Sequence, residues 1–296
     1  MYSAIASNAR RSWLLIAVFV AFVLGLGWLL DQYFQAGGAI IVIAFVWSLI
    51  SALVSYYAGD KVALWTAGAK PIEKRDAPDL YNVVENLCIA EGVPTPKIYI
   101  INDPSPNAFA TGRDPAHASI AFTSGLVQMM DKSELQGVAA HELSHVKNND
   151  IRLMTMVVVL VGTVTLITQI FVRTRWIGGG GNRRNEGGIV VLILGLVAII
   201  VAPIVANLIK LAVSRRREYL ADASGALLTR YPEGLANALE KIGAYGQPLQ
   251  HASAATAHLY IANPFGSRPS GIANLFSTHP PLADRIKALR EMGNQP

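Results

Sequence analysis

Cysteine and charged residues are scarce in this chain. Cys88 is the single cysteine among 296 residues, which excludes an intrachain disulfide framework and a cysteine-rich zinc finger. Charged residues make up 15% of the sequence, against roughly 25% in a soluble globular protein. Hydrophobic residues reach 52%, yet the mean hydropathy is only +0.36. This composition disfavours an ordinary soluble enzyme, a disordered chain and a chain buried wholly in lipid. It predicts a few membrane spans and a sizeable soluble part.

The sequence also lacks a basic soluble face. Residues 60–152 carry 9 basic and 12 acidic side chains, and residues 214–296 carry 9 and 6. The net charges of these two blocks, −3 and +3, cancel, so the net charge of +5 lies in the apolar segments and their flanks. Basic residues beside spans are topology signals, whereas nucleic-acid binding requires a basic face on a soluble domain. We therefore predict no nucleic-acid partner and a lipid bilayer around part of the chain.

Four apolar stretches are long enough to cross a membrane. Their approximate limits are 13–30, 37–57, 153–172 and 189–211. A buried core helix is the alternative for any one of them, but core helices are usually shorter and apolar on one face. A signal peptide is the alternative for the first, but its apolar run exceeds the usual run of about 7–15 residues. We therefore predict two transmembrane hairpins, within residues 1–59 and 153–213.

Lysine and arginine near the spans predict the orientation of the chain. The first hairpin has basic residues before it and after it, and none in its connection: Arg10, Arg11, Lys61, Lys70, Lys74 and Arg75. Residues 60–152 are therefore expected in the cytoplasm. The second hairpin is ambiguous, because the loop 173–188 carries four arginines and one acid. Either spans three and four cross despite this loop, or they do not cross fully. In both cases residues 60–152 and 214–296 lie on the same side.

The blocks 60–152 and 214–296 are expected to form one catalytic domain of mixed helices and strands. Apolar spacing and turn residues predict helices over 79–90, 133–149, 219–228, 232–243 and 281–292, and strands over 97–101 and 119–123. Ser133 and Gln136 suggest a capping box at the start of the second helix, which should run on towards the third span. Residues 107–117 are rich in turn formers. The expected fold class is an α-rich integral membrane protein with an α+β soluble domain.

A metal site is predicted where two histidines stand four residues apart. His141 and His145 fall on a predicted helix, so their imidazoles project from one face, one turn apart. Two such nitrogens can hold one Zn²⁺ at about 2.1 Å. Glu142 then lies where it can accept a proton from metal-bound water. The alternative is a pair of surface histidines on a solvated helix, which the preceding strand and the Ala139-Ala140 lead-in disfavour.

A zinc peptidase needs a third protein ligand and an open position for water. Asn148 and Ile151 stand where a metzincin would carry glycine and a third histidine, which excludes that extension. Glu218 and Asp222 are spaced i, i+4, so one can bind zinc while the other accepts a ring N–H from a zinc-bound histidine. An ordinary charge pair is the alternative for Glu218. The spacing leaves other ligands open: Glu233, Glu240, His251, His258 and His279.

In their order along the chain, these motifs resemble the M48 family of zinc metallopeptidases. The matching segments are HELSH at 141–145 followed by Asn148 and Asp150, SRRREYLAD at 214–222, and THPPLADR at 278–285. Two spans before and two after the HExxH helix resemble its HtpX-type membrane branch, whereas the prenyl-protein protease branch has more spans. The resemblance implies a zincin-like cytosolic catalytic domain with one Zn²⁺ per chain. It also implies a multi-pass protein of the bacterial inner membrane.

The resemblance assigns further roles. Glu218 becomes the third zinc ligand, and Asp222 supports a zinc-bound histidine. His279 and Arg285 are expected near the catalytic centre, where His279 would act in catalysis. Residues Asn107, Ala108, Phe109 and Ala110 are expected to line the substrate groove. A loop histidine is the alternative for His279, and a plain turn is the alternative for residues 107–110.

We therefore expect a membrane-bound zinc metalloendopeptidase with Glu142 as general base. The resemblance implies proteolytic quality control of membrane proteins under stress, with membrane-protein or unfolded polypeptide substrates. His145 and Glu218 lie within eight residues of predicted spans, or roughly 8–12 Å along a helix, so the site should face the membrane surface. A transporter or channel with a structural zinc domain is the alternative, but the spans lack the interior charges such proteins use. A homo-oligomer is left open.

Overall fold

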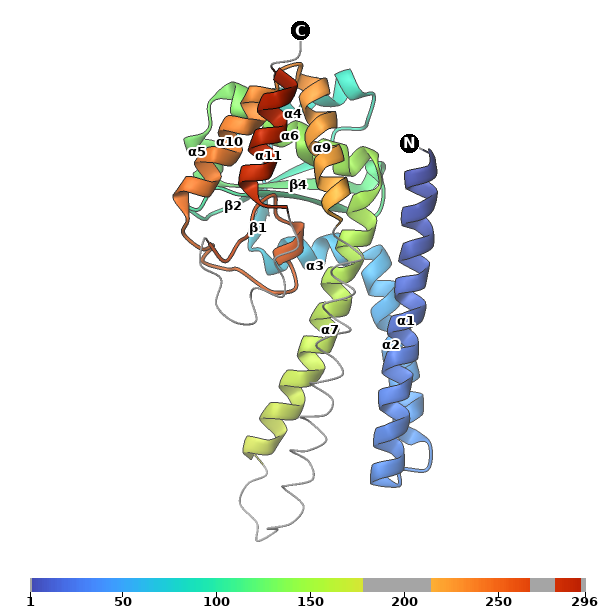
Figure 1. Cartoon of the computed structure of the whole chain (residues 1–296). Helices are drawn as coiled ribbons and strands as arrows, with labels where there is room; N and C mark the ends of the chain where they lie inside the picture. Colours follow the sequence, from blue (N-terminus) through green and yellow to red (C-terminus); the bar gives the residue numbers. More distant parts are fainter. Residues whose placement is uncertain (1, 178–213, 267–279, 294–296) are drawn as a thin grey trace.

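The computed structural model describes residues 2–177, 214–266 and 280–293. Figure 1 shows a helix-rich domain built around a small sheet, with long helices that project from one side of it. The N-terminus lies beside the domain, so the first helix begins at the level of the domain and runs away from it. This arrangement brings the start of the first long helix close to the soluble part of the chain.

The sheet has four strands in the order β1-β2-β4-β3. They are β1 (Ala69–Pro71), β2 (Lys97–Ile101), β3 (Ala108–Gly112) and β4 (Ala118–Thr123). Strand β2 is parallel to β4, while β1 and β3 pair antiparallel with their neighbours. The strands predicted over 97–101 and 119–123 are confirmed. Strand β3 lies within residues 107–117, where turn residues alone indicated a loop, and it forms an edge of the sheet.

Both faces of the sheet are covered. On one face, Ala110 of β3 and Phe122 of β4 join a core formed with the helices α4 (Pro78–Glu91), α6 (Lys132–Lys147) and α10 (Pro232–Tyr245). On the other, Phe109 and Ala121 pack with α3 (Gly59–Thr66) and with α7 (Asp150–Ile177). Successive residues of a strand point to opposite faces. Strand β3 therefore lies between the layer that contains α6 and the layer that leads to the membrane helices.

Helix α6 begins earlier and ends earlier than the sequence predicted. Its capping box is formed by Asp131 and Glu134 rather than by Ser133 and Gln136. Asp131 accepts the backbone N–H of Glu134, and the hydroxyl of Ser133 donates to the same carboxylate from inside the first turn. Helix α6 ends at Lys147, and Asn149 adopts a left-handed conformation with φ of 54°. The expected continuous passage into the third span is therefore wrong, because α7 starts afresh at Asp150.

The remaining helices agree with the predicted ones within a few residues. They are α9 (Arg215–Thr229), α10 and α11 (Leu282–Gly293). Helix α5 (Ser124–Met129) and the short turns η1 (Pro115–His117) and η2 (Ala257–Leu259) were not predicted. Helix α9 packs directly against α6: a Cβ atom added at Gly225 would lie 3.0 Å from the backbone nitrogen of His141. The glycine thus allows the two helices that carry the candidate metal ligands to approach closely.

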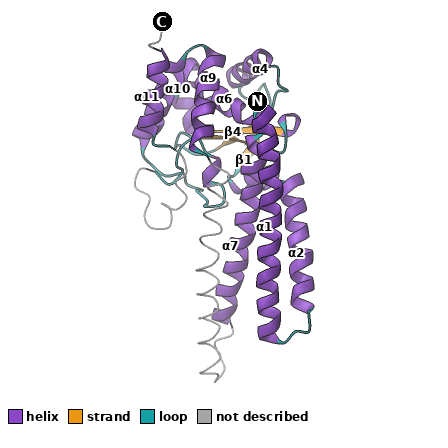
Figure 2. Ribbon diagram, turned by 45° about the vertical axis from the view of Figure 1, so that its right-hand side comes forward, coloured by secondary structure: helices purple, strands orange, loops and turns teal. Residues whose placement is uncertain are grey.

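Two of the described helices are long and apolar enough to cross a membrane. They are α1 (Tyr2–Phe34), with its candidate span over Arg10–Phe34, and α2 (Ala39–Tyr57). Many of their large apolar side chains are exposed, among them Trp13, Leu14 and Phe45, as expected for helices surrounded by lipid rather than by protein. Helix α7 covers the third predicted span. Figure 2 shows α7 running beside α1 and α2. The fourth predicted span lies outside the described residues.

Candidate metal centre

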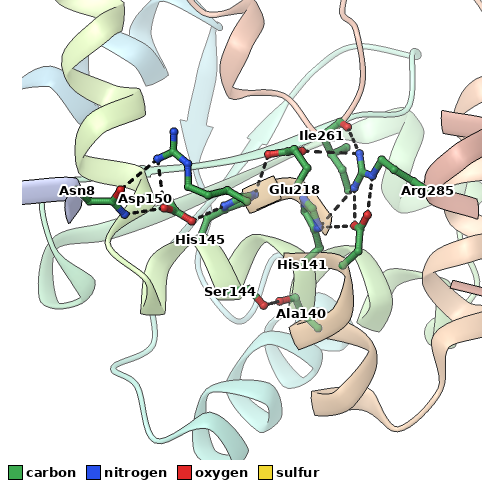
Figure 3. Close-up of polar contacts among 11 residues, drawn as sticks. Asn8, Ala140, His141, Ser144, His145, Asp150, Glu218, Ile261 and Arg285 are labelled. Atoms are coloured by element: carbon green, nitrogen blue, oxygen red, sulfur yellow. Dashed lines mark hydrogen bonds and ion pairs between the residues drawn. The ribbon is translucent and has the colours of Figure 1, made fainter. Parts of the chain in front are cut away.

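Three potential metal ligands converge between α6 and α9. The ligand atoms of His141, His145 and Glu218 all lie within 4.8 Å of one another. Nε2 of His145 is 3.5 Å from Oε1 of Glu218. The three residues are 1%, 4% and 2% exposed, respectively. Figure 3 shows Glu218 facing the two histidines across the contact between the helices. Two imidazoles and one carboxylate in this arrangement form a donor set that suits Zn²⁺.

The ring of His141 is held by a buried ion pair. Its Nδ1 lies 2.9 Å from Oδ1 of Asp222, and Arg285 donates two hydrogen bonds to the same carboxylate, at 2.8 and 2.7 Å. Arg285 also donates to the carbonyl of Ile261 at 2.8 Å. Burial tends to raise the pKa of Asp222, but the charge of Arg285 outweighs it and lowers the pKa to about 2. Asp222 is therefore ionised and accepts the Nδ1–H of His141, which leaves Nε2 available for a metal.

The ring of His145 has a different carboxylate partner. Its Nδ1 lies 3.2 Å from Oδ2 of Asp150, the first residue of α7. Burial lowers the pKa of His145, but the hydrogen bond to Asp150 and the charge of Glu218 outweigh it, and the pKa rises to about 9. The acidic groups around this ring thus favour a positive charge at its position. A bound cation is stabilised by the same surroundings.

Glu142 is buried beside the cluster without a full set of partners. It is 1% exposed, and its Oε1 has no hydrogen-bond partner among the residues that the structure describes. Burial raises its pKa to about 7; the charge of Glu218 adds to this rise, and His145 opposes it. A buried carboxylate oxygen without a partner is costly. A water molecule bound to a metal ion at the cluster would supply the missing partner, so the residues present fit a hydrated metal ion.

The other candidate ligands lie elsewhere. Glu233 and Glu240 both pair with Arg290, at 3.8 and 2.7 Å. His251 is exposed, and Nε2 of His258 lies 2.8 Å from the carbonyl oxygen of Met154. His279 lies outside the described residues. Glu218 is therefore the acidic candidate that the described part of the chain brings to the two histidines.

The predicted substrate-binding residues lie on β3, or in the case of Asn107 directly before it, beside the cluster. The backbone N–H of Ala110 forms a hydrogen bond that lowers the pKa of Glu142. The buried side chain of Asn107 donates to the carbonyl of Ala262 at 3.0 Å, and the carbonyl of Ala108 accepts the N–H of Ile261 at 2.9 Å. The Phe109 ring meets Tyr260 edge to face at 5.0 Å. Residues 260–262 thus already occupy the outer edge of β3 near Ala108.

Sequence reasoning missed the residues that support His145. Asp150 entered only as part of a motif, and Asn8 was given no role at the site. The nearness of Asp150 to the second histidine was a usable signal, because a carboxylate soon after a metal-binding histidine can accept its free ring N–H. Asn8 gave no such signal, since the sequence does not show which part of α1 meets the start of α7.

The matching family model and two full-length relatives both describe peptidases. The model of "Peptidase family M48" matches residues 74–293. The "Protease HtpX homolog" of Caldanaerobacter subterraneus subsp. tengcongensis is 46% identical over 296 residues, covering 99% of this chain and 98% of the relative. The "Protease HtpX homolog" of Tropheryma whipplei strain Twist is 47% identical over 297 residues, covering 100% and 99%. Among solved structures, "Crystal Structure of S. mikatae Ste24p" is similar with a TM-score of 0.49 and 18% identity, covering 98% of this chain and 67% of that one.

Proposed function

The chain belongs to peptidase family M48, and from this premise we propose that it cleaves polypeptides at one Zn²⁺ held by His141, His145 and Glu218. The family and the relatives make the chain a metalloprotease. They give no support to the alternative of a transporter or channel with a structural zinc domain. The assignment of each residue to its role is the proposal.

One observation carries this assignment. The three candidate ligand atoms lie within 4.8 Å of one another, and Nδ1 of each histidine faces a carboxylate of its own. Both rings can therefore present Nε2 to a single ion. A structural zinc site is usually closed by four protein ligands, whereas a catalytic site keeps one position open. Three ligands beside a buried glutamate favour catalysis.

Each residue around the cluster is proposed to have a separate role in the reaction. Zinc bound there would supply a Lewis acid that lowers the pKa of a water molecule towards 7. Glu142 lies where it would accept a proton from an attacking water and pass it to the departing amine. Asp222 and Asp150 hold the histidine rings in place. We keep His279 as the proposed donor to the developing oxyanion, on the family resemblance alone.

The substrate is proposed to bind in extended form along β3. Ala110 is the centre of this proposal, because its N–H faces Glu142 and alternate residues of a strand present their backbone to the same edge. Because Ile261 already binds the carbonyl of Ala108, the substrate would pair with the strand at Ala110, while Asn107, Ala108 and Phe109 would border the same groove next to residues 260–262. Strand addition of this kind supplies backbone hydrogen bonds regardless of the substrate's sequence. It therefore suits a protease that acts on membrane proteins or unfolded chains.

The location proposed for this site is the cytoplasmic surface of the bacterial inner membrane. Two described helices can cross a membrane, and the basic residues around them favour a cytoplasmic catalytic domain. Asn8 donates a hydrogen bond to Asp150, the carboxylate partner of His145, and precedes the candidate span of α1 by two residues. A multi-pass chain with four spans remains our proposal. Substrates close to the bilayer would then meet the site most readily.

Purified Glu142→Gln protein tests the proposed function. Wild type and variant are prepared in detergent with chelator, and Zn²⁺ is added back for the assay of casein cleavage. Glu142→Gln should bind one Zn²⁺ and cleave at least about 100-fold more slowly, since general acid–base groups contribute that much or more. His141→Ala is the matched control, which should lose both zinc and activity. Glu142→Gln protein that cleaves at the wild-type rate would contradict the mechanism.

The membrane location needs a separate measurement. The same unfolded segment is offered to the enzyme in liposomes, once free and once attached to a membrane anchor. The anchored form should be cleaved faster, because both partners are then confined to one surface and the effective concentration is higher. Equal rates for the two forms would contradict a site that faces the bilayer.

A further inference from the structure

Helix α1 buries one stripe of side chains against α7. Asn8 and Ser12 are followed along this stripe by apolar residues at helical spacing, and these pack on the first turns of α7: Leu15, Phe19 and Val23 meet Leu153, Met156, Val157 and Leu160. Residues outside the stripe, such as Trp13 and Leu14, are exposed. The apolar contact fixes the rotation of α1 about its own axis and its position along α7. It thereby places Asn8 beside the start of α7, which is also where α6 ends.

Asn8 binds both sides of the turn between α6 and α7. Its amide nitrogen donates to Oδ1 of Asp150 at 2.7 Å and to the carbonyl of Asn148 at 3.3 Å. The amide is buried, with the residue 4% exposed. Figure 3 shows the side chains of Asn8, Asp150 and His145 in a row, joined by hydrogen bonds that end at the ring of His145. The hydrogen bond from Asn8 joins a membrane helix to the end of the HExxH helix.

The two oxygens of Asp150 have separate partners. Oδ2 faces Nδ1 of His145 at 3.2 Å, while Oδ1 accepts from Asn8. Arg217, next to Glu218 on α9, lies 3.4 Å from both Oδ1 of Asp150 and Oδ1 of Asn8. With Oδ1 held by Asn8, the carboxylate presents Oδ2 to the histidine. Residues that fix a carboxylate partner in this way orient the metal ligand itself.

We propose that Asn8 is a positioning residue of the metal centre, which acts through Asp150 to fix the ring of His145. The N-terminal membrane helix is then a working part of the zinc site as well as an anchor. This inference rests on the proposed function, because it assumes that His145 binds zinc. It implies that loss of the contact between α1 and α7 weakens zinc binding without removing any ligand.

Zinc affinity tests the inference directly. Measurements use full-length protein in the Glu142→Gln background, which prevents self-cleavage, and a competing chelator of known affinity. Asn8→Ala should weaken zinc binding by about 10–100-fold, as loss of an outer-shell partner does elsewhere. Ser12→Ala is the matched control: Ser12 is equally buried, one turn further along α1, and its hydroxyl donates to the carbonyl of Asn8. Its zinc affinity should remain unchanged.

A double-mutant cycle separates positioning from a loss of packing. If Asn8 acts through Asp150, Asn8→Ala should cost no further zinc affinity in an Asp150→Ala protein. Losses that simply multiply in the double variant would overturn the inference. So would an Asn8→Ala protein whose zinc affinity equals that of Ser12→Ala while its melting temperature falls. Failure of the Glu142→Gln reference to bind zinc would instead overturn the proposed function, and the two failures are thus distinguishable.

Discussion

The two histidines of helix α6 are supported by two different parts of the molecule. His141 rests on Asp222 and Arg285, which belong to the C-terminal half of the catalytic domain. His145 is hydrogen-bonded to Asp150, the first residue of α7, and Asp150 is held by Asn8 of α1, a helix that can cross a membrane. One support thus lies within the catalytic domain, while the other requires that the membrane helices be in place. If His145 binds zinc as proposed, this asymmetry makes the N-terminal helix α1 part of the support of the metal site.

The two supports also differ in charge and burial. Arg285 is 0% exposed and binds Asp222 through two hydrogen bonds, so this ion pair is wholly removed from water. The side chain of Arg217 is 13% exposed and lies 3.4 Å from Asp150, and the closest partner of Asp150 is the neutral amide of Asn8. Removing one partner of a buried ion pair costs more than weakening a partly exposed one. The comparison therefore predicts an order of effects.

Substitution of Asp222 should have the largest effect on stability. Asp222→Asn removes the carboxylate that is hydrogen-bonded to the buried guanidinium of Arg285 and leaves Glu218, at 3.9 Å, as its remaining ion-pair partner, which should lower the free energy of unfolding by about 3–5 kcal/mol. Zinc affinity should fall as well, because the ring of His141 loses its acceptor. Denaturant unfolding of the zinc-free protein in detergent measures the first effect. An Asp222→Asn protein as stable as wild type would contradict the claim that the partners of His141 contribute more to stability than those of His145.

Substitution of Asp150 should affect zinc more than stability. Asp150→Asn keeps a polar group of the same shape, and Arg217 retains some contact with water, so the loss of stability should be about 1–3 kcal/mol. Zinc affinity should fall by about 10–100-fold. The same unfolding and chelator-competition measurements apply to both variants. The opposite ranking, with Asp150→Asn less stable than Asp222→Asn, would reverse the comparison.

Cys88→Ala is the control for a core substitution away from the residues that hold the two histidines. Cys88 is buried in α4, and burial raises the pKa of its thiol to about 11 despite a hydrogen bond with Thr95 that lowers it. Cys88→Ala should cost about 1 kcal/mol of stability and leave zinc affinity unchanged. Native wild-type protein should also react slowly with a thiol reagent at pH 8, because little thiolate is present. Weaker zinc binding in Cys88→Ala would mean that packing alone governs the site.

Local patterns in the sequence predicted much of the fold and part of the site. Apolar spacing and turn residues identified helices α4, α9, α10 and α11 and strands β2 and β4. The i, i+4 spacing of His141 with His145, and of Glu218 with Asp222, was readable because a helix places such pairs on one face. The choice of Glu218 over its rivals came from the family resemblance. In each case the residues that decide the structure are close together in the sequence or belong to a known motif.

The contacts that could not be predicted are long-range or depend on competing local signals. Asn8 and Asp150 are 142 residues apart, and only the packing of α1 on α7 brings them together. The break between α6 and α7 depends on the left-handed conformation of Asn149, which the surrounding helical pattern concealed. Asp131 replaced Ser133 as the cap because its carboxylate accepts the N–H of Glu134. Strand β3 formed despite its turn residues, because pairing with β4 and burial on both faces outweigh local preference.

X-ray absorption at the zinc edge of the zinc-loaded Glu142→Gln protein tests the central claim most directly, namely that two histidines and Glu218 hold the metal. We predict a first shell of nitrogen and oxygen atoms at about 2.0–2.2 Å and no sulfur at about 2.3 Å. Outer-shell scattering should correspond to two imidazole rings, and in Glu218→Ala protein one oxygen ligand should be lost or replaced by water. A sulfur shell, or scattering from one or three imidazoles, would contradict the account.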